Sequence, residues 1–158
     1  MMKLQAMEAK VLRAGIVDLE AILELQKDCY MSEAEIYNDY TIPALNQDLA
    51  SLKKEYEHTT ILKCLVNDEI AGSVRAYAEN DTVYIGRLIV GKDHQNKGYG
   101  SLLMRSIELE FGDYQRFELF TGHKSLKNLY LYNKLGYREF RRERKNDNLT
   151  LVYLEKKI

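Results

Sequence analysis

The chain has 158 residues, of which 46% are hydrophobic and 30% are charged. This composition is typical of one globular domain rather than of a disordered chain. The 23 basic and 24 acidic residues leave a net charge of −1, so no global field favours nucleic acid or an anionic membrane. No apolar run approaches the roughly 18 residues of a membrane span, and residues 1–14 are too polar for a signal peptide. We expect a single cytoplasmic domain over residues 1–158, with no nucleic-acid or membrane partner.

Cysteine and histidine spacing indicates no metal site. Cys29 and Cys64 show no CxxC pattern, so they are expected to be reduced, inert thiols. The three histidines, at positions 58, 94 and 123, also lack the spacing of metal ligands.

The first third of the chain predicts one short strand and two helices. Val11 and Leu12 suggest the strand, and Asp18 can cap a helix that ends near Tyr30. A second helix is expected over residues 43–56, beginning at its proline. Eight carboxylates lie between residues 18 and 48, against one basic residue, which is a local acidic bias in a neutral protein.

The rest of the chain alternates strand-like and helix-like segments. An antiparallel meander is followed by a helix, a strand, a second helix and a closing hairpin. The expected strands cover residues 61–66, 70–78, 82–90, 117–121, 137–144 and 149–155, and the expected helices cover residues 98–111 and 125–134. This order predicts an α/β (α+β) fold, with a central mixed, mainly antiparallel, twisted sheet of about seven strands flanked by about four helices.

Polar and glycine residues between Val90 and Leu103 join an apolar strand to an amphipathic helix. The first turn of a helix has backbone N–H groups without intrahelical partners, and the helix dipole adds to their attraction for anions. Gly98 and Gly100 lack a Cβ, which lets a ligand approach the backbone closely. This stretch therefore predicts a phosphate-binding site.

Two common phosphate-binding loops do not fit this stretch. A Walker A loop has lysine after its last glycine, whereas Gly98 is followed by Tyr99. A dinucleotide-binding turn needs a small residue at position 103, which is leucine. The remaining pattern, Gln95-x-x-Gly98-x-Gly100, resembles motif A of the GNAT superfamily, the acetyl-CoA-dependent N-acetyltransferases. The resemblance places motif A at residues 90–103 and implies binding of the coenzyme A pyrophosphate.

A second segment, residues 125–137, is similar to motif B of that family, which ends in Leu-Tyr-x-Lys-x-Gly-Phe/Tyr. The resemblance implies that Tyr132 is the general acid that protonates the departing coenzyme A thiolate. A tyrosine with an ordinary pKa near 10 keeps its proton at pH 7. The family commonly has asparagine where this chain has Ser125 and alanine where it has Asn128.

Acetyl-CoA is the cosubstrate that the resemblance implies. Backbone N–H groups near the end of the preceding strand could polarise the thioester carbonyl. The residues expected to bind the cofactor are Leu88, Ile89, Val90, Gln95, Asn96, Lys97, Gly98, Tyr99, Gly100, Ser101 and Asn128.

The sequence leaves the general base open. Tyr84 and Glu118 lie on the two strands expected to line the cleft, and either could accept a proton from the substrate ammonium. Glu79, His94, His123 and an ordered water chain are alternatives.

We expect an N-acetyltransferase in which a primary amine attacks acetyl-CoA directly in a ternary complex, without a metal. The acidic tract falls where the resemblance places the acceptor pocket and favours a small cationic molecule. A peptide or protein N-terminal acetyltransferase, and a non-catalytic coenzyme A-binding sensor or interaction module, are alternatives. Either a monomer or a homodimer is compatible with the sequence.

Overall fold

The structure is a computed structural model that describes residues 9–158; the first eight residues of the predicted domain lie outside this range. The described part contains seven strands and five α-helices. The strands are β1 (Lys10–Arg13), β2 (Thr60–Val66), β3 (Glu69–Glu79), β4 (Thr82–Val90), β5 (Arg116–Gly122), β6 (Arg138–Arg144) and β7 (Thr150–Lys157). The helices are α2 (Leu19–Tyr37), α3 (Pro43–Asn46), α4 (Leu49–Tyr56), α5 (Tyr99–Glu110) and α6 (Leu126–Lys134), with short 3-10 turns η1 (Ile16–Asp18) and η2 (Lys92–His94).

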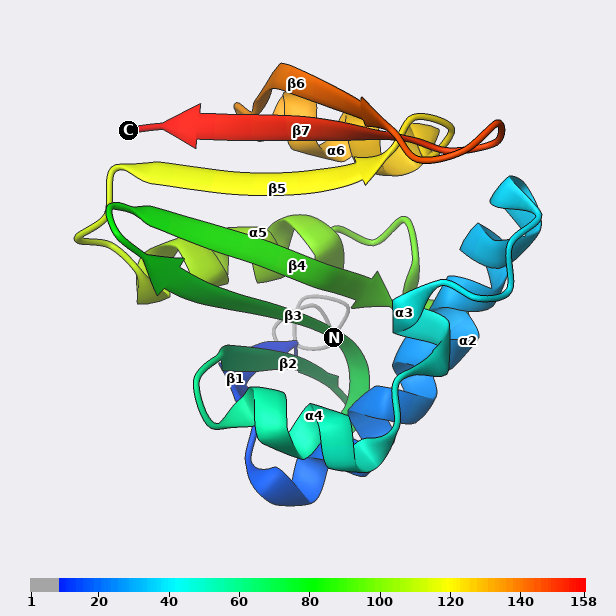
Figure 1. The fold of residues 1–158 in the computed structure, drawn as a ribbon. Coiled ribbons are helices and arrows are strands. Elements are labelled where there is room, and N and C mark those ends of the chain that lie inside the picture. Colours follow the sequence, from blue (N-terminus) through cyan, green and yellow to red (C-terminus); the bar gives the residue numbers. More distant parts are fainter. Residues whose placement is uncertain (1–8) are drawn as a thin grey trace.

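All seven strands form one sheet in the order β1-β2-β3-β4-β5-β7-β6 (Figure 1). Every neighbouring pair is antiparallel except β4 and β5, which are parallel. The crossover through α5 makes this parallel pair possible. The predicted mixed sheet, its meander and its closing hairpin are therefore confirmed.

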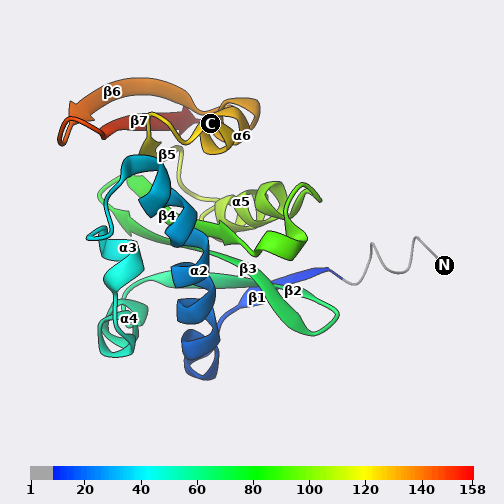
Figure 2. The same ribbon diagram turned by 90° about the vertical axis from the view of Figure 1, so that its right-hand side faces the viewer.

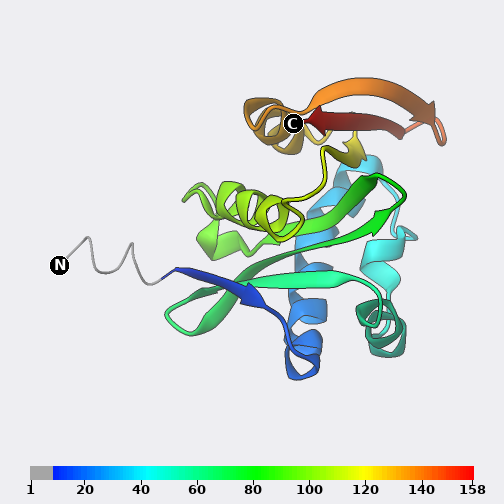
Figure 3. The same ribbon diagram turned by 90° about the vertical axis from the view of Figure 1, so that its left-hand side faces the viewer.

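Helices cover both faces of the sheet and one of its ends. Figures 2 and 3 show α3 and α4 on one face, and α5 and α6 on the other, while α2 passes the end of the sheet where β4 finishes. The larger core packs α5 against the sheet through Leu103, Met104 and Ile107. A second core joins α2 and α4 through side chains that include Leu19 and Leu52. The two cores therefore pack α2, α4 and α5 around the end of β4.

Two predicted helix boundaries are wrong. The helix expected to end near Tyr30 continues to Tyr37, because Ala34 and Tyr37 are still buried on its inner face. The helix expected over residues 43–56 is divided, since Gln47 has extended backbone and Asp48 starts a new helix by accepting the Ser51 N–H at 2.8 Å. Capping of this kind satisfies a helix N–H group without an intrahelical partner.

The parallel strands β4 and β5 pair over a short length only. Their last aligned residues are Tyr84 and Glu118, and beyond this pair the strands diverge (Figure 1). An irregularity in the β3–β4 register follows, and Arg87 has a φ of 51°. Backbone groups of β4 that face β5 beyond Tyr84 are consequently left without a strand partner.

Candidate active site

Two cavities adjoin the diverging strands. The larger has a volume of about 870 Å³ and extends from the end of β4 to α2, the start of α5 and α6. The smaller has a volume of about 320 Å³ and lies among β3, β4, β5 and α4. Strand β4 contributes residues 88–90 to the larger cavity and residues 84–87 to the smaller one. The two cavities therefore follow one another along a single strand.

The loop before α5 forms one wall of the larger cavity. Asn96 and Gly98 have φ values of 63° and 87°, and Gly98 caps the helix that begins at Tyr99. The Gln95 side chain donates a hydrogen bond to the Val90 carbonyl at 3.0 Å, which ties the loop to the end of β4. Residues 99–101 line the cavity, so the first-turn N–H groups of α5 lie at its wall. This arrangement suits an anion.

The structure brings the predicted cofactor-binding residues together around the larger cavity. Its lining includes every one of them except Lys97, whose side chain is exposed. Asn128, on α6, is oriented by a hydrogen bond that its side-chain amide donates to the Thr121 hydroxyl at 3.2 Å. Residues separated by some 40 positions in the sequence thus share one wall, since α6 lies beside the start of α5.

Tyr132 is buried and is not in the lining of either cavity. It is 6% exposed, and its ring centroid is 6.1 Å from that of Tyr137. Burial raises the pKa of Tyr132 above its ordinary value, and Tyr30 and Glu33 raise it further. A tyrosine in this setting remains protonated at neutral pH and can serve only as a proton donor there.

Both base candidates face the smaller cavity. Tyr84 and Glu118 are aligned on β4 and β5 at the last paired position before the strands diverge. Tyr84 stacks on Tyr77 with ring centroids 5.3 Å apart, and Glu118 accepts a hydrogen bond from Arg116 at 2.8 Å. The structure thus brings these two candidates together.

The other base candidates are placed less favourably. Glu79 is exposed and lines neither cavity. His123 also lines neither cavity, and its Nδ1 accepts the backbone N–H of Thr150 at 3.0 Å. His94 lies in η2, beyond the end of β4, and lines the larger cavity, whereas Tyr84 and Glu118 line the smaller one.

Residues that the sequence did not single out also line the cavities. Tyr30 and Glu33 come from α2 and lie at and just beyond the position where the sequence predicted this helix to end. Both line the larger cavity. Arg75 and Arg87 line the smaller cavity. A signal for Arg75 did exist, because it is a charged residue inside the otherwise apolar run of β3. Glu33 belongs to the acidic tract noted in the sequence, whereas no comparable signal marks Tyr30.

The acidic tract between residues 18 and 48 does not gather at one cavity. Of its eight carboxylates, only Glu33 lines either of the two. Asp18 pairs with Lys63 at 2.8 Å, and Asp39 accepts hydrogen bonds from Thr41. Asp48 caps α4. Part of the acidic bias therefore stabilises local structure.

The cysteines, the possible metal ligands and the basic cluster do not form a further functional site. Burial raises the pKa of the Cys29 thiol to about 11, and Cys64 is fully buried in the larger core. Among residues 9–158, no group of three or more histidine, cysteine or acidic side chains could hold a metal ion. The basic cluster at residues 141–145 forms local ion pairs on β6 and its turn. In the same described range, no helix is both long and apolar enough to span a membrane.

Comparison with known proteins agrees with this geometry. The model of the acetyltransferase (GNAT) family matches residues 19–137. No curated protein matches the sequence significantly. Solved structures share the fold: smu.2055 from Streptococcus mutans has a TM-score of 0.81 at 18% identity and covers 94% of this chain and 98% of its own.

Two further solved structures with this fold are acetyltransferases. A GNAT family acetyltransferase from Elizabethkingia anophelis with acetyl-CoA bound has a TM-score of 0.68 at 17% identity, covering 96% of this chain and 99% of its own. The ribosomal-protein-S18-alanine N-acetyltransferase of Escherichia coli has a TM-score of 0.78 at 16% identity, covering 95% and 94%. At these identities the likeness concerns the fold, whereas the family match spans most of the chain. The chain belongs to the GNAT family of acetyltransferases.

Proposed function

We propose that the protein transfers an acetyl group from acetyl-CoA to the primary amine of a small cationic molecule, by direct attack in a ternary complex. The observation that carries this proposal is the succession of two cavities along β4, both in the part of the strand from Tyr84 onward, where β4 and β5 separate. One cavity suits a phosphate-bearing cofactor and the other a small acceptor. Reactants bound in both would meet at the separation.

The larger cavity would bind acetyl-CoA. First-turn N–H groups of α5 would accept the pyrophosphate, which the helix dipole also favours. The pantetheine arm would then run along Leu88, Ile89 and Val90, where β4 has backbone groups without a partner on β5. The acetyl-CoA bound to the Elizabethkingia anophelis relative supports the choice of cofactor.

The proposed reaction conserves atoms and charge. The substrate ammonium first loses a proton to a base, for which Tyr84 and Glu118 remain the candidates. The amine nitrogen then forms a bond to the thioester carbonyl carbon, the carbon–sulfur bond breaks, and Tyr132 gives its proton to the departing thiolate. The acylated nitrogen, which still carries two protons, releases one of them to solvent and becomes the neutral amide nitrogen, and the base also returns its proton to solvent. The products are an N-acetyl amide and coenzyme A. Bulk solvent subsequently restores the tyrosine proton.

The size of the smaller cavity supports a small acceptor. A volume of about 320 Å³ lies at the lower end of the range for small-molecule sites. Glu118, which is paired with Arg116, supplies a carboxylate on this side that could accept a hydrogen bond from the ammonium group of the acceptor. The similar structures from Escherichia coli and Brucella melitensis are ribosomal-protein-alanine N-acetyltransferases, so a peptide acceptor is a distinct outcome to test. Cytoplasmic location and a monomeric or homodimeric state remain predictions.

Acetyl-CoA binding tests the cofactor assignment. A Cβ at Gly100 would lie 3.3 Å from Leu131, so Gly100→Glu adds both bulk and negative charge beside the proposed phosphate site. We expect calorimetric affinity for acetyl-CoA to fall more than about tenfold. Leu109→Glu, which places the same charge on an 80% exposed position of α5, is the matched control. Equal affinity in Gly100→Glu and wild type would contradict the phosphate assignment.

Turnover tests the reaction itself. Thiol release from acetyl-CoA would be measured with free amino acids, amino-acid amides, diamines and an alanine-initiated peptide. We expect release with at least one small amine and little with the peptide. Peptide turnover alone would replace the small-molecule acceptor, and binding of acetyl-CoA without any release would favour a non-catalytic module.

A further inference from the structure

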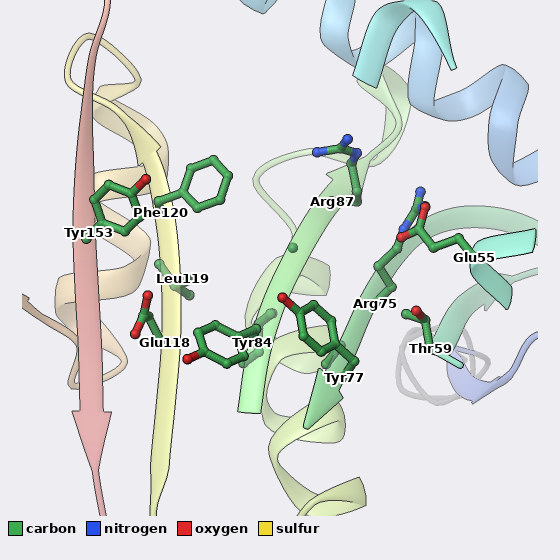
Figure 4. Close-up of a pocket in the computed structure, with 13 residues that line it drawn as sticks. Glu55, Thr59, Arg75, Tyr77, Tyr84, Arg87, Glu118, Leu119, Phe120 and Tyr153 are labelled. Carbon is green, nitrogen blue, oxygen red and sulfur yellow. The ribbon is translucent and has the colours of Figure 1, made fainter. Parts of the chain in front are cut away.

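Two arginines lie together at one end of the smaller cavity. Figure 4 shows Arg87, from β4, and Arg75, from β3, beside Glu55, with Tyr77, Tyr84 and Glu118 toward the other end. Arg75 is 3% exposed, and Arg87 is half-buried. Guanidinium groups are rarely placed inside a protein without acceptors for their N–H groups, because losing water leaves the charge uncompensated.

Arg75 is held in place by its neighbours. Its Nη1 donates to Glu55 at 2.9 Å, and its Nη2 donates to Gln26. Gln26 is itself fully buried and donates to the Ala44 carbonyl at 2.8 Å. The Arg75 guanidinium is therefore oriented before any ligand arrives, and its charge is balanced by Glu55.

Arg87 has no such partner. Among residues 9–158 it makes no hydrogen bond or ion pair, and its nearest aromatic contact is the Tyr30 ring, with 5.9 Å between the guanidinium carbon and the ring centroid. Its Nε is shielded from solvent without an acceptor, as is the Nε of Arg75. Arg87 has a positive φ and lies at the irregularity of β4, beyond the last residue of this strand that pairs with β5.

The remaining carboxylate of this cavity does not neutralise Arg87. Glu118 forms an ion pair with Arg116, which is also on β5, at a distance of 2.8 Å. The cavity therefore contains two positive and two negative side chains, but both negative ones are paired with other arginines. One positive charge is left at the Arg87 end.

We propose that the acceptor carries a carboxylate beside its amine, and that Arg87, flanked by Arg75, binds this carboxylate. The inference rests on the proposed function and keeps the ammonium group of its acceptor. It adds a carboxylate, so that the acceptor becomes an amino acid or a similar small amino carboxylate, which is zwitterionic rather than cationic. A planar carboxylate matches the guanidinium fork, and it would give Arg87 the acceptor that the protein does not supply. The cavity volume of about 320 Å³ accommodates a molecule of this size. The amine would extend toward the separation of β4 and β5.

The alternative role for Arg87 is contact with the cofactor, because Tyr30 also lines the larger cavity. The two roles predict different kinetics. An arginine that binds the acceptor carboxylate affects only acceptors that have one. An arginine that binds acetyl-CoA affects every acceptor equally and raises the KM for acetyl-CoA.

The test compares acids with their amides. Thiol release is measured with each of the free amino acids and with the matching carboxamide. For the best acceptor we expect kcat/KM to be at least about tenfold higher for the acid than for the amide. Arg87→Gln should bring this ratio close to one, and Arg87→Lys should retain part of it. Arg105→Gln, at an exposed position of α5, should leave the ratio unchanged. A ratio near one in the wild type, or an equal loss with acid and amide in Arg87→Gln, would overturn the proposal.

A binding measurement separates this inference from the proposed function. Saturation-transfer NMR is recorded with coenzyme A and an equimolar mixture of free amino acids, then with the mixture of their amides. Binding of acids that is lost in Arg87→Gln supports the carboxylate site even without turnover. Binding of no acid by the wild type refutes it, even if other amines are acetylated. Thermal unfolding of each variant confirms that the fold is retained.

Discussion

Tyr132→Phe removes one hydroxyl group from α6 and tests the proposed proton donor directly. Because the ring is 6% exposed and packs against Tyr137, the phenylalanine ring should keep its place. Loss of one hydroxyl should change the free energy of unfolding by no more than about 1 kcal/mol. Since Tyr132 lines neither cavity, the affinity for acetyl-CoA should also be retained. Any large effect should therefore appear in the chemical step.

The expected loss follows from the role of a general acid. Such groups contribute about 10² to 10⁴ in rate, and an amine attacking a thioester already has a good leaving group. We therefore expect the lower end, a decrease in kcat of about a hundredfold, or about 2.7 kcal/mol in activation free energy.

The pKa shift adds a second expectation. Burial raises the pKa of Tyr132, and Tyr30 and Glu33 raise it further, so deprotonation of this residue should cause no decrease in kcat below about pH 10. A decreasing alkaline limb that is present in the wild type below that pH and absent from Tyr132→Phe would refute this reasoning.

Single-turnover thiol release is the appropriate assay, because product release could otherwise mask the chemical step. Tyr40→Phe is the matched control, since it removes a hydroxyl from a 52% exposed tyrosine that lines neither cavity. We expect this control to have the wild-type rate. If Tyr132→Phe also stays within about twofold of wild type, Tyr132 is not the general acid.

Three further predictions concern stability and reactivity. A Cβ at Gly122 would overlap the Tyr37 hydroxyl, so Gly122→Ala should lower the free energy of unfolding by about 1–3 kcal/mol. Gly86→Ala is the control and should not lower it, because no heavy atom lies within 4 Å of the added Cβ. Equal Tm values for the two variants would contradict the predicted clash. Burial raises the pKa of Glu33, so ionisation costs the folded state stability as the pH rises above the unfolded value of about 4.3. The stability of Glu33→Gln relative to wild type should therefore improve between pH 4 and pH 7, and a constant difference by denaturant titration would oppose this. With a pKa of about 11, Cys29 at pH 8 should react with a thiol reagent about a hundredfold more slowly than a free cysteine, and an equal rate would show that the thiol is not shielded.

Patterns within short windows of sequence predicted most of the fold. The alternation of strand and helix, the meander and the parallel crossover depend on local periodicity and on chain connectivity, both of which are visible in one sequence. The sequence did not predict the break at Gln47 and Asp48, because a helix cap involves only a few residues inside a pattern that is otherwise helical. A buried hydrogen bond from Gln26 to the Ala44 carbonyl accompanies this break. The late end of α2 was missed because it depends on burial against distant strands.

The two motifs were sufficient to indicate a phosphate loop at residues 95–101 and a tyrosine on α6. These features are local, since a helix N-terminus and its glycines are adjacent in the chain. The register that aligns Tyr84 with Glu118 could not be read from the sequence.

The sequence by itself thus determined the order of the elements and the family resemblance, and it predicted the anion-binding loop. Only the tertiary structure decided where β4 and β5 stop pairing, that Tyr132 is buried and lines neither cavity, and that Arg75 and Arg87 both line the smaller cavity. The physical reason is that a cavity and the charge balance inside it depend on side chains from strands and helices far apart in sequence. Tertiary packing, and not the neighbouring residues in the chain, determines whether an arginine forms an ion pair with a carboxylate.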